Sequence, residues 1–192
     1  MTVKTIILAA GQGTRMRSVL PKVLHKVANR SLLEHVYDTS KQIDDNEIII
    51  VYGHGGELVK ETLSELEAKW VEQKEQLGTG HAVLQVDNLI GNEDTILILY
   101  GDVPLLSKRS IDSLLAKVTA QSMALLTVVL ENPVGYGRIV RDAANKVLKI
   151  VEQKDATEQE QLIDEVNTGI LAVKGEQLKS WISRLDNSNA QQ

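Results

Sequence analysis

Four short apolar runs along the chain have the length and composition of buried strands. They lie at residues 5–9, 47–52, 95–100 and 123–130, and Ile and Leu are their commonest residues. Continuous runs of this kind, without the alternation of a half-exposed strand, are typical of parallel strands covered on both faces. The pattern therefore predicts a largely parallel sheet with a buried centre.

Segments with helical periodicity separate these runs. Ser31 and Glu34 have the spacing of a capping box, a second helix should follow residues 55–56, and Ser107 or Ser110 can cap a third. A further helix is expected to start near residues 80–82. The side chains expected on buried helix faces are Leu32, Leu33, Val36, Tyr37 and Ser40; Leu58, Leu63 and Leu66; Ile111, Leu114, Leu115 and Val118; and Leu178, Trp181, Ile182 and Leu185.

Strands that alternate with helices of this length predict βαβ units with right-handed crossovers. After residue 130 the pattern changes to short strands at residues 138–141, 147–152 and 165–173, separated by turn-like or charged segments. The expected fold is α/β: one domain with a Rossmann-like, doubly wound, mainly parallel sheet and a small strand-rich lobe.

Composition narrows the range of functions. The chain has 21 Lys and Arg against 26 Asp and Glu, a net charge of −5, whereas a nucleic-acid-binding domain usually needs a basic face. It has no cysteine, which excludes disulfides, thiolate metal sites and a cysteine nucleophile. The histidines have no metal-like spacing, so zinc is not expected. No stretch approaches the roughly 20 apolar residues of a membrane span, and we expect a cytoplasmic protein without a membrane partner.

The segment after the first predicted strand carries the clearest chemical signal. Gly11 and Gly13 form a Gly-x-Gly turn, with Arg15 just beyond it and Lys22 seven residues later. Glycines at the carboxyl end of a parallel strand let backbone N–H groups approach an anion. The segment matches neither a P-loop nor a dinucleotide fingerprint. Two cations beside such a turn suit a triphosphate; a tight turn with solvated Arg and Lys is the alternative.

The residues Leu-x-x-Gly-x-Gly-Thr-Arg-Met and Leu-Pro-Lys-Val-Leu resemble those of sugar-phosphate nucleotidyltransferases. The resemblance is most specific to the N-terminal pyrophosphorylase domain of bacterial bifunctional N-acetylglucosamine-1-phosphate uridyltransferases/glucosamine-1-phosphate acetyltransferases. Six further blocks match in order and extend it over essentially the whole chain: residues 51–56, 75–82, 99–105, 135–139, 150–156 and 165–170.

The resemblance implies a fold of the nucleotide-diphospho-sugar transferase type, with a sugar-binding lobe. It implies transfer of a uridylyl group from UTP to N-acetylglucosamine-1-phosphate, which gives UDP-N-acetylglucosamine and pyrophosphate. The product would supply cell-wall and lipopolysaccharide synthesis. By the resemblance, Arg15 and Lys22 are catalytic, Asp102 holds Mg²⁺, and substrate is bound by Leu8, Ala9, Ala10, Gly11, Lys22, Gln73, Gly78, Thr79, Tyr100, Gly101, Asp102, Gly137, Glu152 and Asn167.

Each assignment has a plainer alternative when its residue is taken alone. Asp102 could cap the loop that follows it, and Gln73 is more simply a polar surface residue. Gly137, Glu152 and Asn167, expected to hold the amino sugar, are individually ordinary surface residues. Arg138 and Lys154 could add positive potential near the sugar phosphate or be solvated. The prediction of a nucleotide-binding site requires Arg15, Lys22 and Asp102 to converge on one hollow.

The chain departs from the related enzymes in its length. They continue past the position of residue 192 with the rest of this domain, which includes an asparagine that is a second metal ligand. A left-handed β-helix follows, which carries the acetyltransferase and builds a trimer. We therefore expect an incomplete nucleotidyltransferase domain that is monomeric or weakly associated, with weak or absent transferase activity. Two alternatives stay open: a fragment that binds nucleotide or nucleotide-sugar without turnover, and a related transferase with another sugar or base.

Overall fold

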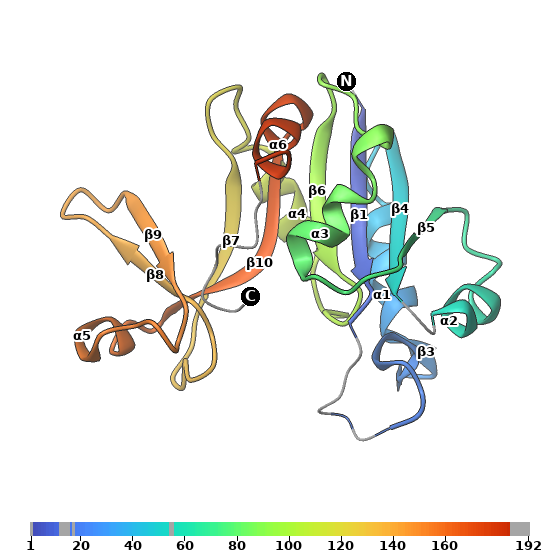
Figure 1. Cartoon of the computed structure of the whole chain (residues 1–192), viewed down its shortest axis with the longest axis horizontal. Helices are drawn as coiled ribbons and strands as arrows, with labels where there is room; N and C mark the ends of the chain where they lie inside the picture. The colour runs from blue at the N-terminus through green and yellow to red at the C-terminus, as the bar shows by residue number, and fades with distance from the viewer. Residues whose placement is uncertain (1, 12–15, 17, 54–55, 185–192) are drawn as a thin grey trace. The chain divides into compact units, whose positions relative to one another are not determined.

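The computed structural model describes residues 2–11, 16, 18–53 and 56–184. The chain forms two compact units (Figure 1). Unit 1 comprises residues 1–124 and 172–192, and unit 2 comprises residues 125–171. Arg15 and Leu185, for which the sequence predicts roles, lie outside the described residues.

Unit 1 is built on four parallel strands that include β1 (Val3–Ala9) at their centre. The strand order is β5 (Lys69–Gln73), β4 (Asn46–Gly53), β1 and β6 (Thr95–Tyr100), with β10 (Glu165–Lys174) next to β6. The strands β4, β1 and β6 are the first three predicted apolar runs, and Ile6, Ile7, Ile49, Ile50 and Leu97 are fully buried at the centre of the sheet. Side chains that are excluded from water on both faces explain why these runs do not alternate.

The helices of unit 1 lie on both faces of this sheet. The helices α3 (Thr79–Leu84) and α6 (Gly175–Ile182) contact each other on one face, drawn in front in Figure 1, and α1 (Leu32–Lys41) and α4 (Lys108–Leu115) lie behind the strands. The short α2 (Glu57–Thr62) contacts β4. The remaining short elements are η2 (Lys22–Leu24), the hairpin of β2 (Lys26–Val27) and β3 (Arg30–Ser31), and η3 (Asp87–Leu89).

Two glycines make the approach of α6 to the start of β6 possible. The Gly175 N–H donates to the Asp94 carbonyl over 2.9 Å. A Cβ on Gly175 would collide with the Gly91 carbonyl oxygen, so no larger residue fits there without a shift of the backbone. This contact fixes the end of β10 beside the first residues of β6.

Unit 2 is rich in strands, as the sequence predicts. It contains β7 (Ala124–Val129), β8 (Arg138–Arg141), β9 (Val147–Val151), the short α5 (Glu158–Gln161) and most of β10. The strand β8 lies between β9 and β10, and β7 pairs with β10. The Arg141 guanidinium donates to both carboxylate oxygens of Glu165 at 2.7 Å, which lowers the pKa of that carboxyl and ties β8 to β10.

The structure confirms the predicted α/β class and the positions of the predicted strands, with boundaries within a few residues. The prediction that the run at 123–130 is buried is wrong, because in β7 only Ala124 is buried, and Val128 and Val129 are exposed. The prediction for α2 is wrong for Leu58, which is 46% exposed while Val59 is buried; Leu63 is buried as predicted, although the helix ends at Thr62. Trp181 is also largely exposed, and Val118 lies beyond the end of α4. The sequence did not reveal β5 or the β2–β3 hairpin. Among the described helices, none has the length and apolar character needed to cross a bilayer.

The capping box at the start of α1 forms as predicted. The Ser31 hydroxyl accepts from the Glu34 N–H at 3.2 Å, and the Ser31 N–H donates to the Glu34 carboxylate at 2.7 Å. Hydrogen bonds from Ser31, its side chain first, lower the pKa of Glu34. We expect Ser31→Ala to lower the free energy of unfolding by about 1 kcal/mol at neutral pH, measured by chemical denaturation.

Because the pKa of Glu34 is lowered in the folded state, its contribution is complete above the ordinary pKa of a carboxyl group. The contribution is lost as the pH falls through the lowered value. The deficit of Ser31→Ala should therefore shrink in acid. Ser64→Ala, at an exposed turn position, is the matched control and should unfold like the wild type. An equal loss of unfolding free energy in Ser64→Ala would show that the capping hydrogen bonds do not account for the effect of Ser31→Ala.

Candidate functional site

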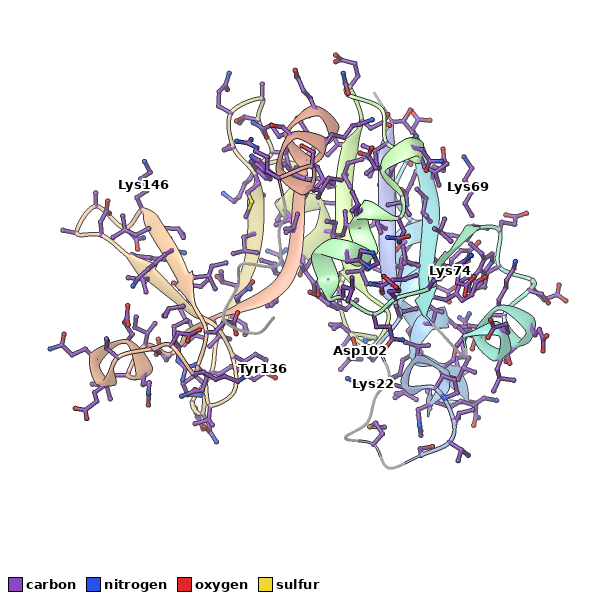
Figure 2. The ribbon with its side chains drawn as sticks, viewed as in Figure 1. Lys22, Lys69, Lys74, Asp102, Tyr136 and Lys146 are labelled. Atoms are coloured by element: carbon purple, nitrogen blue, oxygen red, sulfur yellow. The ribbon has the colours of Figure 1, made fainter. Side chains whose placement is uncertain are left out.

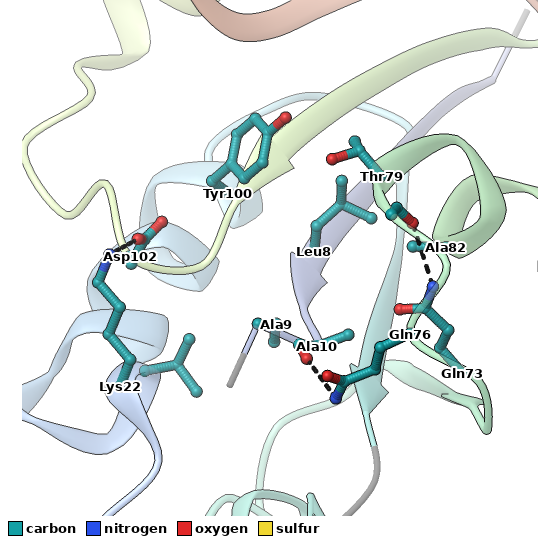
Figure 3. Close-up of a pocket in the computed structure, with 13 residues that line it drawn as sticks. Leu8, Ala9, Ala10, Lys22, Gln73, Gln76, Thr79, Ala82, Tyr100 and Asp102 are labelled. Carbon is teal, nitrogen blue, oxygen red and sulfur yellow. Dashed lines mark hydrogen bonds and ion pairs between the residues drawn. The ribbon is translucent and has the colours of Figure 1, made fainter. Parts of the chain in front are cut away.

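A cavity of about 290 Å³ opens in unit 1 beside the carboxyl ends of the parallel strands (Figure 3). It is lined by residues from the strands β1, β5 and β6, from the segments that follow these strands, and from η2 and α3. The lining residues are Leu8, Ala9, Ala10, Gly11, Lys22, Val23, Gln73, Gln76, Gly78, Thr79, Ala82, Tyr100 and Asp102. They include all but Gly101 of the described unit 1 residues that the sequence analysis assigns to substrate.

The strand registers explain why residues so far apart in the sequence meet here. In the parallel pairs, Leu8 lies opposite Tyr100, Ala9 opposite Tyr52, and Gly53 opposite Gln73. The four strands thus end at one level, and each next segment leaves from the same edge of the sheet. Such an edge is the usual ligand crevice of an open α/β sheet.

Gly11 lines the cavity at the point where the chain leaves β1. Its φ lies outside the left-handed region, and an added Cβ would meet no atom of the described residues within 4 Å. Neither backbone conformation nor packing against this part of the chain requires a glycine. The described residues therefore leave the space next to its Cα open.

Lys22 and Asp102 form an ion pair at the edge of the cavity (Figures 2 and 3). Lys22 is held by η2, whose Val23 and Leu24 are buried, and Asp102 follows the end of β6. Their side chains are 39% and 26% exposed. The predicted cation and acid thus converge on one hollow, while the third member of that prediction, Arg15, lies outside the described residues.

The acid at this edge is the candidate metal ligand. Within the described ranges, no group of three or more His, Asp or Glu side chains could enclose a metal ion. Mg²⁺ commonly takes only one or two protein carboxylates and completes its shell with phosphate oxygens and water. One carboxylate oxygen donor facing an open cavity fits that ion, and fits no site that needs several protein ligands.

Gln73 is buried, with 2% exposure, so its interpretation as a polar surface residue is wrong. Its amide nitrogen donates to the Gly78 carbonyl over 3.1 Å and lies 3.1 Å from Nδ1 of His81. Gly78 has a φ of +95°, a left-handed conformation that favours glycine. Figure 3 shows the Gln73 amide with its oxygen turned toward the cavity.

A second glutamine, Gln76, lines the cavity and was given no role in the sequence analysis. Its amide nitrogen donates to the Ala10 carbonyl over 2.9 Å. An added Cβ at Gly53 would lie 2.5 Å from that nitrogen and 2.7 Å from the same carbonyl oxygen. Gly53 therefore makes room for the hydrogen bond that ties the segment after β5 to the end of β1. The glycine beside a strand end was the available signal, but its partner is set only by the fold.

Gly101 lies behind the cavity. Its N–H donates to the Leu8 carbonyl over 2.9 Å, and an added Cβ would lie 3.2 Å from Val23 and 3.3 Å from Leu33. It holds the end of β6 against β1.

The three residues expected to hold a sugar lie together within unit 2. The Asn167 N–H donates to the Gly137 carbonyl over 2.8 Å. An added Cβ at Gly137 would lie 3.1 Å from Oε1 of Glu152, and Glu152 is exposed to solvent. The Asn167 side-chain oxygen accepts from the Gly169 N–H at 2.8 Å, which leaves its amide nitrogen to donate elsewhere.

Arg138 is 1% exposed, so solvation at the surface is the wrong interpretation of this residue. Its guanidinium donates to the Tyr136 carbonyl and to the Gln153 side chain, the latter at 2.7 Å. The residue supports the loop that leads into β8. Lys154 is exposed.

Comparison with known proteins identifies relatives over most of the chain. Residues 5–165 match the family model of the MobA-like NTP transferase domain. The bifunctional protein GlmU of Methylococcus capsulatus is 56% identical over 191 residues, which are 100% of this chain and 41% of that protein. The chain thus spans less than half the length of this relative.

Solved structures share the fold at low sequence identity. A UDP-glucose pyrophosphorylase complexed with UDP-glucose matches with a TM-score of 0.74 and 19% identity, over 97% of this chain and 81% of that one. A nucleotidyl transferase from Methanothermobacter thermautotroptrophicus matches with a TM-score of 0.68 and 19% identity, over 96% and 77% of the two chains.

Two glycines at the cavity give a matched pair of variants. Gly53→Ala places a Cβ against Gln76 and Ala10, and we expect it to lower the free energy of unfolding by about 1–3 kcal/mol, as overpacking does. Gly11→Ala enters open space and should change that free energy by less than about 0.5 kcal/mol. Urea denaturation of both variants measures the difference. Equal losses would contradict the assignment of Gly53 to packing and of Gly11 to ligand space.

Proposed function

The chain belongs to the family of MobA-like NTP transferase domains, and we propose that it is a uridylyltransferase region acting on an amino-sugar phosphate. The proposed reaction joins UTP and N-acetylglucosamine-1-phosphate to give UDP-N-acetylglucosamine and pyrophosphate. The relative that is 56% identical over the whole chain supports this choice of substrates.

One observation supports the proposal above all others. A single cavity at the carboxyl ends of parallel strands is lined by the backbone of residues 8–11, by the Lys22–Asp102 pair and by the buried amide of Gln73. A triphosphate needs cations and backbone N–H groups, and a base needs fixed donors and acceptors. The cavity offers groups of both kinds.

In the proposed reaction, an oxygen of the sugar phosphate attacks the α-phosphorus of UTP, the bond to the β-phosphate oxygen breaks, and pyrophosphate leaves. The attacking phosphate is already ionised at neutral pH, so no general base is needed. Two polyanions must be held together, and catalysis then consists of positioning and charge neutralisation. No other residue chemistry is required of the chain.

Each side chain at the cavity has one part in this scheme. Lys22 leaves its pair with Asp102 to neutralise phosphate, and Arg15 stabilises the charge that grows on the leaving group. Asp102 holds Mg²⁺, which would neutralise phosphate oxygens when bound. Gln73 and the backbone at Gly78 contact the uracil edge. In unit 2, Gly137, Glu152 and Asn167 bind the hydroxyl and acetamido groups of the sugar.

The proposal covers only the transfer reaction. The relative's name describes a bifunctional protein, and the chain corresponds to 41% of its length. No second activity is proposed for this chain.

The direct test measures pyrophosphate release from UTP and N-acetylglucosamine-1-phosphate in the presence of Mg²⁺. We expect release that depends on both substrates and that stops when a chelator removes the metal, because the charge on the phosphates is then no longer neutralised. CTP, GTP and dTTP with the same sugar phosphate, and glucose-1-phosphate with UTP, are the substrate controls.

Calorimetry with UDP-N-acetylglucosamine separates the alternatives. Binding without pyrophosphate release would identify a nucleotide-sugar-binding fragment and contradict the proposed activity. Faster release with another sugar phosphate or nucleotide would identify a related transferase and contradict the proposed substrates.

The two cations provide the sharpest variants. Lys22→Ala and Arg15→Ala should each lower kcat by about 10²-fold or more, the scale of one lost charge-stabilising donor. Lys26→Ala, a loss of charge at an exposed position four residues after Lys22, is the matched control and should keep wild-type turnover. Unchanged kcat in Lys22→Ala or in Arg15→Ala would remove that residue from the mechanism.

A further inference from the structure

The imidazole of His81, in the first turns of α3, lies between two glutamine amides. Its Nδ1 is 3.1 Å from Nε2 of Gln73, and its Nε2 is 3.0 Å from Nε2 of Gln85. Each of these amide nitrogens also faces a backbone carbonyl at 3.1 Å, that of Gly78 for Gln73 and that of His81 itself for Gln85. A carbonyl oxygen only accepts, so each carbonyl favours the orientation in which the NH₂ end of the amide faces it.

The ring cannot satisfy both amides in this arrangement. A neutral imidazole has one N–H and one lone pair, and a protonated one has two N–H groups. Both glutamines present NH₂ groups, and both therefore require the lone pair. One of the two contacts must give way.

The difference in burial decides which of the two amides donates to the lone pair of the imidazole. Gln73 is 2% exposed, whereas Gln85 is partly exposed at the carboxyl end of α3. An amide NH₂ that faces an N–H in a buried place loses a hydrogen bond without replacement by water. Gln85 can turn its amide oxygen to the ring or its side chain toward water. The lone pair therefore belongs on Nδ1, facing Gln73, and the proton on Nε2.

We infer that His81 is a positioning residue that selects the base of the nucleotide by fixing the orientation of the Gln73 amide. With its NH₂ group held by the Gly78 carbonyl and by Nδ1 of His81, Gln73 turns its oxygen to the cavity (Figure 3). An acceptor at that point suits the N3–H of uracil and opposes the N3 lone pair of cytosine. The inference rests on the proposed function and adds to it a residue that does not line the cavity.

The experiment compares the affinity for UTP with that for CTP, each with Mg²⁺, by calorimetry. His81→Leu removes one of the two acceptors that hold the Gln73 NH₂ group, which weakens the preference for this orientation of the amide and lets the NH₂ group face the base in a larger fraction of the molecules. The preference for UTP over CTP should fall by about fivefold or more, as expected for one hydrogen bond that changes from favourable to opposed. His81→Asn, which can place an oxygen acceptor near the position of Nδ1, should restore most of the preference.

Two controls separate positioning from folding. Gln85→Ala removes the partner on the other side of the ring and should leave the preference unchanged, since the lone pair on Nδ1 of His81 accepts from Gln73 and not from Gln85. The affinity for inorganic pyrophosphate, which has no base, should be equal in all variants that keep the fold. A loss of pyrophosphate and nucleotide affinity together in His81→Leu, with no rescue in His81→Asn, would show a merely structural role and overturn the inference.

The remaining outcomes also decide the matter. An unchanged preference in His81→Leu overturns the inference while the proposed function stands. A loss in Gln85→Ala as large as that in His81→Leu overturns the assignment of the lone pair. A wild type that shows no preference for UTP contradicts the proposed function, and the inference falls with it.

Discussion

The parallel pairing of β1 with β4 on one side and β6 on the other is the constraint on which the site depends. Since all three strands run the same way, their carboxyl ends meet at one edge, and β5 extends that edge by the pairing of Gly53 with Gln73. Residues more than 90 positions apart in the sequence, such as Leu8 and Tyr100, therefore lie opposite each other in the sheet. The buried Ile and Leu side chains that stabilise the sheet therefore also fix the geometry of the cavity.

The sequence predicted those parts that depend on local signals. Continuous apolar runs give the buried strands, and the Ser31–Glu34 spacing gives the cap of α1, because both patterns are complete within a few residues. The edge strand β5 escaped prediction because its residues are mostly half-exposed and include no apolar run. The face of α2 was misassigned for a similar reason: one turn and a half of helix carries too few positions for a period to be measured.

The candidate site divides in the same way. Lys22 and Asp102 were predicted to converge, and the ion pair between them follows from the fold. The burial of Gln73 and the hydrogen bond of Gln76 could not be predicted. The first depends on the turn that brings the Gly78 carbonyl back to Gln73, and the second on the pairing that brings the end of β1 close to Gln76. The identity of a polar residue does not show which backbone carbonyl will accept a hydrogen bond from it in the folded protein. The amino-acid composition does not predict such hydrogen-bonded pairs, because they form only once the folded backbone brings the two groups together.

The energy of the Lys22–Asp102 pair suits a site that must exchange partners. Both side chains are partly exposed, and ion pairs of this kind contribute only about 0–1 kcal/mol, because water screens the attraction and ordering two side chains costs entropy. A phosphate group offers Lys22 more charge and several oxygens, so exchange toward a polyphosphate is favourable. Until then the pair keeps both side chains at the edge of the cavity, and neither needs to be recruited from solvent when a ligand enters. The side chains of a buried ion pair would be more rigidly positioned, but the loss of either partner would then leave an uncompensated buried charge. The partial exposure of the pair is therefore compatible with the exchange of partners that the proposed function asks of Lys22.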